Sequence, residues 1–594
     1  MTTSRAVPHA ATTGATIHRD TYGVPHIYGA TEEDAFYALA WAMGEDGAER
    51  LFLNLRIGVG RGAEVPDGGG ELWAEPARVL RIEEMAQREW DAATPQLRRD
   101  LDAFAEGLEA YRAAFPGRCG SALPADPLQV LAFGRLLFAS FSYRAVVAKA
   151  QSAVEGTDQP IYATDQSNSW ALAGRRTASG KPMLLIDPHW AARGPLALYE
   201  AHVHGGDLDC GGFMPLGYPF LALGYTPGVG WALTAGGADS VDAYELKLHP
   251  EDSDRYWYDG SWRRMGVWEG TRRALNADGD LVEVPYRVRY TVHGPVILED
   301  QGRAFAGAMC DLENDQVATQ FYRMGKARTT EAFREALRMD QLAWFNLTYA
   351  TAEGHIGYVQ VGSCPLRPVR LGEKAALDGT TSATRWQGRV PADGLPQVHD
   401  PDTGWLQNCN TAANVVTDGL AMTREDFPPG ALFGHYGDVW RGRGTRARQM
   451  LRQAEGYTME DGQALAFDTL ALAGLMWRPP LVEGFRRFRD AIDHPPDELD
   501  AALAAVLLLA GLVAAELVIM GAGIEVQADD PRGGFAHADA VAWLQSQPDA
   551  PFRIEGATPL WQPDSAALHG GPLFDIYGIS NPLALAAYDT YYWG

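Results

Sequence analysis

The chain has 594 residues, more than one hydrophobic core usually fills, so its length fits three or four domains or one unusually large layered unit. Hydrophobic residues make up 46% and charged residues 21%, which is ordinary for a globular protein that buries a large core. The formal net charge is -26, and so acidic a surface repels phosphate backbones and anionic lipid headgroups. We therefore expect neither nucleic acid nor a membrane as a partner.

The first twenty residues contain no apolar stretch of the length that a signal peptide needs, so we expect a cytoplasmic location. The five cysteines are scattered and odd in number, and no CxxC pair occurs. This pattern favours neither a zinc site nor a disulfide framework. The cysteines are interpreted as core or incidental thiols.

Helix-spaced apolar residues dominate the first quarter of the chain. They recur over 31–60 and again over 95–150, with few strand-like alternations between them. We therefore predict a mainly helical segment over 1–150. The polar stretch 151–166 has the composition of an exposed linker and is predicted to separate this segment from the rest.

From residue 167 onward the pattern changes to short apolar runs cut by Gly, Pro and Asn, which indicates the strands of a sheet. Helical spacing returns at 329–337 and 445–453. The apolar stretch 501–523 is long enough to raise the question of a membrane span, but Glu516 lies within it. A buried helix is the favoured interpretation, and 167–594 is treated as the second part of the chain.

The run that starts at Ser167 is predicted to be a β-hairpin. An apolar strand is followed by a turn centred near Ala178, and a second strand runs from Pro182 to Asp187. Residues equidistant from a turn face each other across antiparallel strands. Ser167 and His189 are both eleven positions from the turn centre, so we predict that they are neighbours.

The S-N-S-W motif that begins with Ser167 resembles the start of the catalytic chain in the penicillin and cephalosporin acylases, a family of N-terminal-nucleophile (Ntn) hydrolases. In that family the precursor cuts itself immediately before the Ser, and the freed amine serves as the base for its own hydroxyl. An α-amino group has a pKa of about 7.7 to 8.0, which suits this task. The resemblance implies cleavage between Gln166 and Ser167 into a light chain and a heavy chain.

The same resemblance implies further site residues. The segment WALTAG is similar to the family's W-G-x-T-A-G motif, in which the N–H of the residue matching Ala235 donates to the oxyanion. The segment QNCN matches the motif whose last Asn, here Asn410, is the second donor. His189 and Arg443 fall where relatives keep a His and an Arg beside the site. For His189 both a proton-transfer role and a positioning role remain open.

Asp239, Val241 and Asp242 fall where calcium-binding members of the family place two carboxylates and a backbone carbonyl. Such oxygen ligands suit a hard cation. Those members take a further Glu from the end of the helical chain, and 141–151 contains none. Two interpretations therefore stand, a structural calcium ion or aspartates that cap a loop, and no organic cofactor is implied.

Trp190 and Leu223 fall where the family lines its acyl pocket. Members that accept a glutaryl chain carry a cation near the position of Leu223, whereas leucine offers only apolar contact. We therefore expect an aromatic or aliphatic acyl group. The amine part of the substrate stays open, because relatives act on β-lactam nuclei, homoserine lactones, amino acids and lipopeptides.

The fold class that the resemblance implies is α+β, the Ntn-hydrolase four-layer αββα sandwich with a helical N-terminal segment. The implied function is a self-processing acylase, an amide hydrolase that cleaves N-acylated small molecules through Ser167 and an acyl-enzyme. The alternative is an unprocessed relative that binds acylated ligands without catalysis. Two departures favour that alternative: Gln166 stands where the family generally has Gly or Thr, and the resemblance fades after residue 572, so the C-terminal part is short.

Overall fold

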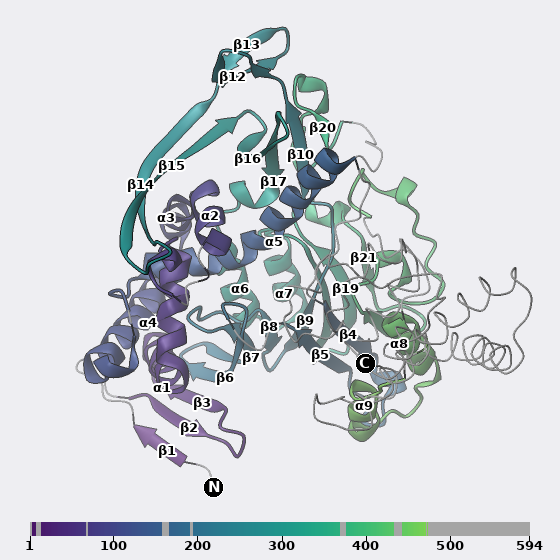
Figure 1. The fold of residues 1–594 in the computed structure, drawn as a ribbon. Helices are drawn as coiled ribbons and strands as arrows, with labels where there is room; N and C mark the ends of the chain where they lie inside the picture. Colours follow the sequence, from purple (N-terminus) through teal and green to yellow (C-terminus); the bar gives the residue numbers. More distant parts are fainter. Residues whose placement is uncertain are drawn as a thin grey trace, which may run out of the picture. The chain divides into compact units, whose positions relative to one another are not determined.

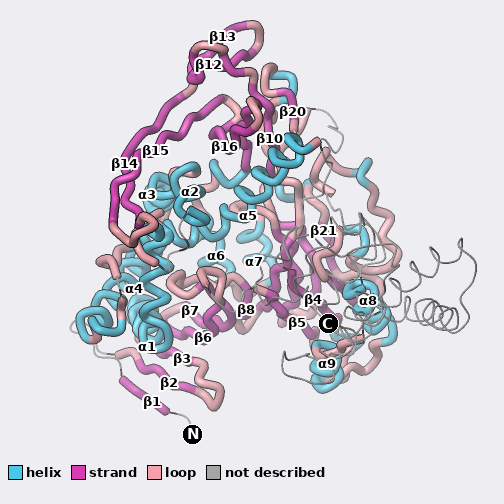
Figure 2. The backbone as a smooth tube through the Cα atoms, viewed as in Figure 1, coloured by secondary structure: helices cyan, strands magenta, loops and turns pink. Residues whose placement is uncertain are grey.

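The computed structural model describes residues 3–6, 14–66, 69, 71–120, 122–156, 166–190, 194–368, 376–432, 442–470 and 472 (Figures 1 and 2). Contacts divide the chain into two compact units, the first formed by Met1–Val439 with Leu451–Gly462 and the second by Trp440–Met450 with Gln463–Gly594. The apolar stretch 501–523 and the end of the chain beyond 572 lie outside the described residues.

An N-terminal helical segment is present, as the sequence predicts (purple to blue in Figure 1). Its helices are α1 (Glu32–Gly58), α2 (Glu71–Val79), α3 (Ile82–Ala92), α4 (Pro95–Ala114) and α5 (Pro127–Glu155). Thr31 and Asp34 form a reciprocal capping pair at the start of α1, and Asp126 caps α5 by accepting from the N–H of Gln129. Gly156, with a left-handed φ of 69°, ends α5.

Helix α5 is the one described helix that is long and apolar enough to cross a bilayer by length and composition. In the structure, 89% of the most apolar 18-residue stretch of this helix is buried inside the fold. It contacts β-strands as well as the helices α1, α3 and α4. This is the placement of a core helix, in which apolar residues all round the helix meet protein.

Two large sheets dominate the first unit (strands magenta in Figure 2). The ten-stranded sheet has the order β1 (Thr3–Ala6), β2 (Thr16–Arg19), β3 (Pro25–Gly29), β6 (Leu198–Gly205), β7 (Leu208–Pro215), β8 (Leu223–Tyr225), β9 (Val229–Ala235), β18 (Phe345–Thr351), β19 (Ile356–Val361) and β21 (Gln397–His399). The six-stranded sheet has the order β14 (Gly266–Leu275), β15 (Leu281–Thr291), β16 (Gly294–Asp300), β17 (Arg303–Met309), β10 (Val241–Leu246) and β20 (Leu377–Asp378). The strands β11 (Leu248–His249), β12 (Asp252–Tyr258) and β13 (Ser261–Arg264) form a small separate sheet.

The predicted hairpin forms a second small sheet that stacks on the ten-stranded one. It contains β4 (Gln166–Leu172) and β5 (Met183–His189), with β22 (Trp405–Asn408) on the other side of β4. This sheet packs against β9 and β18, while α1, α5 and α6 (Val317–Lys326) contribute to the apolar core on the large sheet. On the outer face of the hairpin, Gly462 at the start of α9 (Met459–Ala466) lies against Trp170 and Met183. Within the first unit, helices cover the ten-stranded sheet and the small sheet lies on it, which confirms the predicted α+β class with a helical N-terminal segment.

The helix α7 (Thr330–Leu337) is capped by Thr329, whose side chain accepts from the N–H of Ala332. Helix α8 (Gly442–Gln453) contains the second stretch with predicted helical spacing, 445–453. Most of α8 belongs to the second unit, where Arg446 pairs with Asp468 at 2.6 Å. The helical predictions for 329–337 and 445–453 are therefore confirmed.

Candidate active site

Ser167 lies near the start of β4 and is 1% exposed. Its side chain shares a strand face with Ser169, because residues two apart on a strand point the same way. The hydroxyl of Ser169 lies 2.9 Å from that of Thr348 in β18, so this face packs against the ten-stranded sheet. The Ser167 backbone N–H donates to Oδ1 of Asn410 at 2.9 Å. The candidate nucleophile is therefore buried between two sheets, with its backbone nitrogen hydrogen-bonded.

The register of the hairpin differs by one residue from the predicted one. Ser167 pairs with Pro188, and His189 pairs with Gln166. The prediction took a single residue as the centre of the turn, whereas the connection includes the 3-10 turn Gly174–Arg176 and is centred between two residues. A shift of one residue moves a side chain to the opposite face of a strand. Ser167 and His189 are neighbours, as predicted. They are offset by one position rather than directly opposite, so their side chains lie on opposite faces of the hairpin.

His189 contacts the nucleophile through its backbone. Its N–H lies 3.5 Å from Oγ of Ser167, at the limit of a hydrogen bond. Its ring lies on the outer face of the hairpin, where Nε2 is 3.0 Å from Oδ2 of Asp187 and 3.2 Å from Nδ2 of Asn168. Asn168 also donates to Oδ2 of Asp187 at 2.8 Å. This geometry favours the positioning role for His189 over direct proton transfer.

Asp187 is a residue that the sequence analysis missed. The signal was present, because Asp187 and His189 are two apart on a predicted strand and such residues share a face. The carboxylate supplies His189 with a partner from within its own strand.

Asn410 connects two residues that are far apart in the sequence. Its Oδ1 accepts from the backbone N–H of Ser167, and its Nδ2 donates to the carbonyl oxygen of Ala235 at 2.7 Å. Ala235 is the last residue of β9 and pairs with Phe345 of β18. The structure thus brings together three of the predicted site residues, from positions 167, 235 and 410.

The orientation of Asn410 is fixed by its neighbour Asn408. Asn410 has a φ of 59°, in the left-handed region that asparagine tolerates better than most residues. Oδ1 of Asn408 accepts from the N–H of Asn410 at 3.0 Å and from the hydroxyl of Thr234 at 2.6 Å. Nδ2 of Asn408 donates to the carbonyl of Thr411 at 2.9 Å. Asn408 therefore anchors the turn that carries Asn410 to the end of β9.

Trp190, one of the two predicted acyl-pocket residues, lies in an aromatic cluster. Its ring centroid is 6.4 Å from that of Phe138 and 6.0 Å from that of Phe141, both in α5. Both α5 rings also contact Phe345, at 6.2 and 5.6 Å. Leu223, the other predicted residue, is 2% exposed in β8 and pairs with Phe213 of β7. The cluster thus includes Phe345, the residue of β18 that pairs with Ala235.

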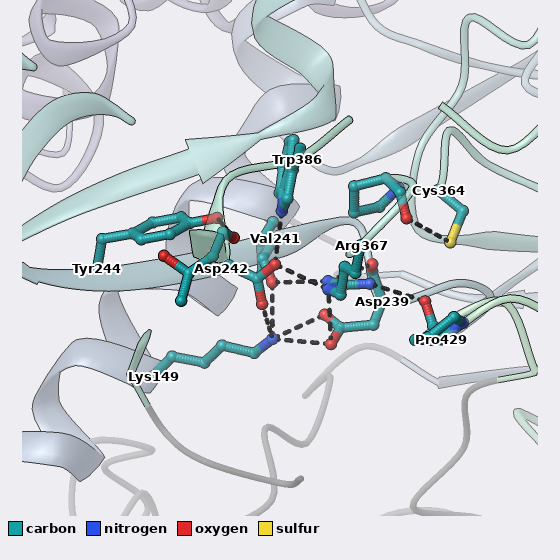
Figure 3. Close-up of polar contacts among 11 residues, drawn as sticks. Lys149, Asp239, Val241, Asp242, Tyr244, Cys364, Arg367, Trp386 and Pro429 are labelled. Carbon is teal, nitrogen blue, oxygen red and sulfur yellow. Dashed lines mark hydrogen bonds and ion pairs between the residues drawn. The ribbon is translucent and has the colours of Figure 1, made fainter. Parts of the chain in front are cut away.

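The predicted calcium ligands lie against two cations (Figure 3). Lys149 contacts Asp239 and the carbonyl of Val241, and Arg367 contacts Asp242 and Asp239. Within the described part of the chain, no group of three or more His, Cys, Asp or Glu side chains is placed to hold a metal ion. The choice between a calcium ion and loop-capping aspartates stays a prediction, because the predicted ligand set contains only two carboxylates and a backbone carbonyl.

Arg443 is the second residue of α8 and belongs to the second unit, whereas Ser167 belongs to the first. Its predicted role beside the nucleophile stays a prediction. All five cysteines are buried, which agrees with their interpretation as core residues.

Residues 14–511 match the model of the penicillin amidase family. The acyl-homoserine lactone acylase PvdQ of Pseudomonas savastanoi pv. phaseolicola is 26% identical over 464 residues, which cover 66% of this chain and 59% of that relative. Penicillin G acylase of Escherichia coli is 27% identical over 304 residues, covering 50% of this chain and 33% of that relative.

A solved structure of a thermostable penicillin G acylase from Alcaligenes faecalis aligns with a TM-score of 0.46 and 23% identity, covering 60% of this chain and 63% of the other. The chain thus spans less than two thirds of the length of these relatives. Because the family model matches most of the sequence, the chain belongs to the penicillin amidase family.

Proposed function

We propose that this chain is a self-processing amide hydrolase that acts on N-acylated small molecules, with Ser167 as its N-terminal nucleophile. The observation that carries the proposal is the Asn410 amide, which spans the nitrogen of Ser167 and the carbonyl of Ala235. Membership of the penicillin amidase family supports the reaction class. The relatives named as homoserine lactone and penicillin acylases support N-acyl amides as the substrates.

In the proposed reaction, cleavage after Gln166 turns the nitrogen of Ser167 into an amine. That amine takes the hydroxyl proton as Oγ attacks the acyl carbon of the substrate. The N–H of Ala235 and Nδ2 of Asn410 stabilise the oxyanion. The proton then passes to the leaving amine, and water releases the acid from the acyl-enzyme. This chemistry requires no organic cofactor.

Asn410 has a second task in this proposal. Its Oδ1 already accepts from the nitrogen of Ser167 in the uncut chain, so it orients the future amine. His189 holds the β5 strand beside the nucleophile through its backbone N–H, while Asp187 and Asn168 fix its ring. We assign His189 a positioning role rather than a catalytic one.

We further propose that the aromatic cluster of Trp190, Phe138, Phe141 and Phe345 receives the acyl group. Phe345 pairs with Ala235 on the neighbouring strand, and Trp190 follows His189 in the sequence. The cluster therefore lies next to both the predicted oxyanion donor and the strand beside the nucleophile. Aromatic side chains favour aromatic or aliphatic acyl groups, because an anionic chain end buried there loses its hydration without compensation.

The test of the proposal is the state of the purified protein. Cleavage before Ser167 should give two bands, and scaling the mass of 64.6 kDa by residue number gives about 18 and about 47 kDa. N-terminal sequencing of the larger band should begin at Ser167. The variant S167A should remain one chain and be inactive, whereas S179A, at an exposed turn position, should be cut as the parent is.

Two results would reject the mechanism. An active protein that consists only of the intact chain would remove the N-terminal amine as the base. An intact and inactive parent that still binds acylated amides would favour the alternative, a relative that binds such ligands without catalysis.

A further inference from the structure

Two positive and two negative side chains meet where β10 begins (Figure 3). Nζ of Lys149, near the end of α5, lies 2.8 and 2.9 Å from the carboxylate oxygens of Asp239. It also donates to the carbonyl of Val241 at 2.7 Å and lies 3.6 Å from Oδ1 of Asp242. These are the oxygen atoms for which the sequence left two interpretations open, calcium ligands or loop caps.

The arrangement does not fit calcium. Calcium binds six to eight oxygen ligands. Here the ammonium group of Lys149 occupies the point on which the oxygens of Asp239 and Val241 converge, at distances typical of charge-assisted N–H···O hydrogen bonds. An ammonium group has three N–H donors, and Lys149 directs hydrogen bonds to both oxygens of Asp239 and to Val241. A divalent ion among the same oxygens would lie in contact with the ammonium, which its charge opposes.

Arg367 completes the charge balance. Its Nε donates to Oδ2 of Asp242 at 2.8 Å, and its Nη2 donates to the backbone carbonyl of Asp239 at 2.9 Å. Trp386 donates to the same oxygen of Asp242 at 2.7 Å. The side chain of Arg367 is 4% exposed and that of Lys149 is 13% exposed, so both charges are largely removed from water. Buried charges are tolerated when they are paired and hydrogen-bonded, as these are.

The charge of Asp239 responds to this environment. Burial by itself raises the pKa of the Asp239 carboxyl, but the charges of Lys149 and Arg367 outweigh burial and lower that pKa below its ordinary value. The Asp239 carboxylate is therefore paired with both cations, at 2.8 Å from Lys149 and 3.3 Å from Arg367. Among the described residues, the same two carboxylates without Lys149 would have Arg367 alone as a counter-charge.

We propose that Lys149 is a built-in cation that takes the place of calcium, so that this chain holds the segment Asp239–Asp242 against α5 without a divalent ion. The segment begins four residues after Ala235, the predicted oxyanion donor at the end of β9. Lys149 lies upstream of the predicted cleavage point and Asp239 lies downstream of it. The ion pairs thus connect the two sides of that point, and the proposal holds whether or not the chain is cut.

The experiment measures thermal unfolding of the full-length protein with excess EDTA and with millimolar calcium. The parent should unfold at the same temperature in both. The variant K149E places a third carboxylate beside Asp239, Val241 and Asp242, so it should unfold at a lower temperature than the parent in EDTA. Added calcium should raise its unfolding temperature by several degrees, because a ligand that binds only the folded state stabilises it.

The matched control is K181E, which makes the same charge change at an exposed lysine in the β4–β5 connection. It should show no response to calcium. A parent that contains one calcium ion per chain, or that loses stability in EDTA and regains it with calcium, would overturn the proposal. So would a K149E variant that matches the parent in EDTA. If K149E yields no folded protein, the calcium content and EDTA response of the parent decide alone.

Discussion

At the scale of single residues, the Asn410 side chain makes the most specific prediction. In the proposed reaction its Nδ2 binds charge that develops only in the transition state. The variant N410A should therefore lower kcat about 100-fold to 1,000-fold, while KM changes far less. Steady-state kinetics with a chromogenic N-acyl amide give both constants.

The matched control for this prediction is N346A. Asn346 also donates to the carbonyl of Ala235, at 3.4 Å, and its Oδ1 accepts from the hydroxyl of Tyr358. Its contacts are with the sheet, so its loss should reduce stability more than turnover. An N410A enzyme whose kcat stays within about threefold of the parent would show that Asn410 is not the oxyanion donor.

His293 makes a prediction that concerns stability alone. Its ring stacks on Tyr244 at 4.0 Å, and its Nε2 donates to the carbonyl of Gly379 at 3.1 Å. Its Nδ1 is buried and finds no hydrogen-bond partner among the described residues. Burial lowers the pKa of His293 to about 4, and Arg385, Asp378 and Asp259 are the charged groups that act on it further.

The sign of the effect follows from the two states. The unfolded chain binds a proton at His293 near pH 6.5, whereas the folded chain binds it only near pH 4. The contribution of neutral His293 to the free energy of unfolding is therefore fully present above pH 6.5. It is lost as the pH falls to 4, and its size is about 3 kcal/mol. Denaturant unfolding of the parent and of H293F across this range should show that the difference between their unfolding free energies changes by about that amount. Parallel pH profiles would contradict the assignment.

At the scale of elements, the sequence predicted which segments form strands and helices but not how the hairpin pairs. The apolar runs that became β4, β5 and β9 carry clear periodicity, and the helical spacing before residue 150 became α1, α4 and α5. Register, however, depends on the conformation of the turn, and the 3-10 turn at Gly174–Arg176 shifted it by one residue. The strands β1 to β3 lie within the segment 1–150 that was predicted to be mainly helical, and the helix α6 lies in the part for which strands were predicted.

The site was predictable only in part for the same reason. Short motifs identified Ser167, Ala235 and Asn410, and the structure brings these three together. The ring of His189 points away from the nucleophile because its face depends on the register. The contact of Lys149 with Asp239 joins a helix to a distant strand end, and no local pattern in the sequence encodes such a contact.

The prediction at this scale concerns substrate preference, because helix α5 supplies two rings of the aromatic cluster, Phe138 and Phe141. The variant F141A should lower kcat/KM for phenylacetyl amides by about 10-fold to 100-fold, because it removes the binding free energy of one buried aromatic contact. The parent should prefer phenylacetyl and octanoyl amides to the glutaryl amide of the same amine. Measuring all three substrates keeps the leaving group constant.

The control is F133A, which removes a ring from the same helix at a position 1% exposed that packs against Gly58. It should lower the unfolding temperature and leave the order of substrates unchanged. Leu223 is 2% exposed in the core, so an arginine there would test stability rather than the acyl pocket. A parent that cleaves the glutaryl amide fastest would mean that a cation serves the pocket, and Arg144, which lies 5.3 Å over the ring of Phe141, would be the first candidate.

At the scale of the whole molecule, the predicted cleavage point separates two parts that share one core. The largest apolar cluster contains residues of α1, α4 and α5 together with residues of β6 to β9 and β18. Strand β3 also pairs with β6 in parallel, so the ten-stranded sheet itself contains strands from both sides of Ser167. Neither part buries its apolar surface without the other.

We therefore predict that the two chains stay associated after cleavage. They should elute together in size-exclusion chromatography and unfold in one cooperative transition, because separation would expose the shared core and break the β3–β6 pairing. The uncut S167A protein provides the comparison, since it has the same contacts and keeps the covalent link. Residues 167–594 expressed alone should be insoluble or partly folded, and adding residues 1–166 during refolding should restore the native elution volume. Light chain that elutes separately from folded, soluble heavy chain without denaturant would contradict a shared core, since burial across the cut would then add too little to hold the chains together.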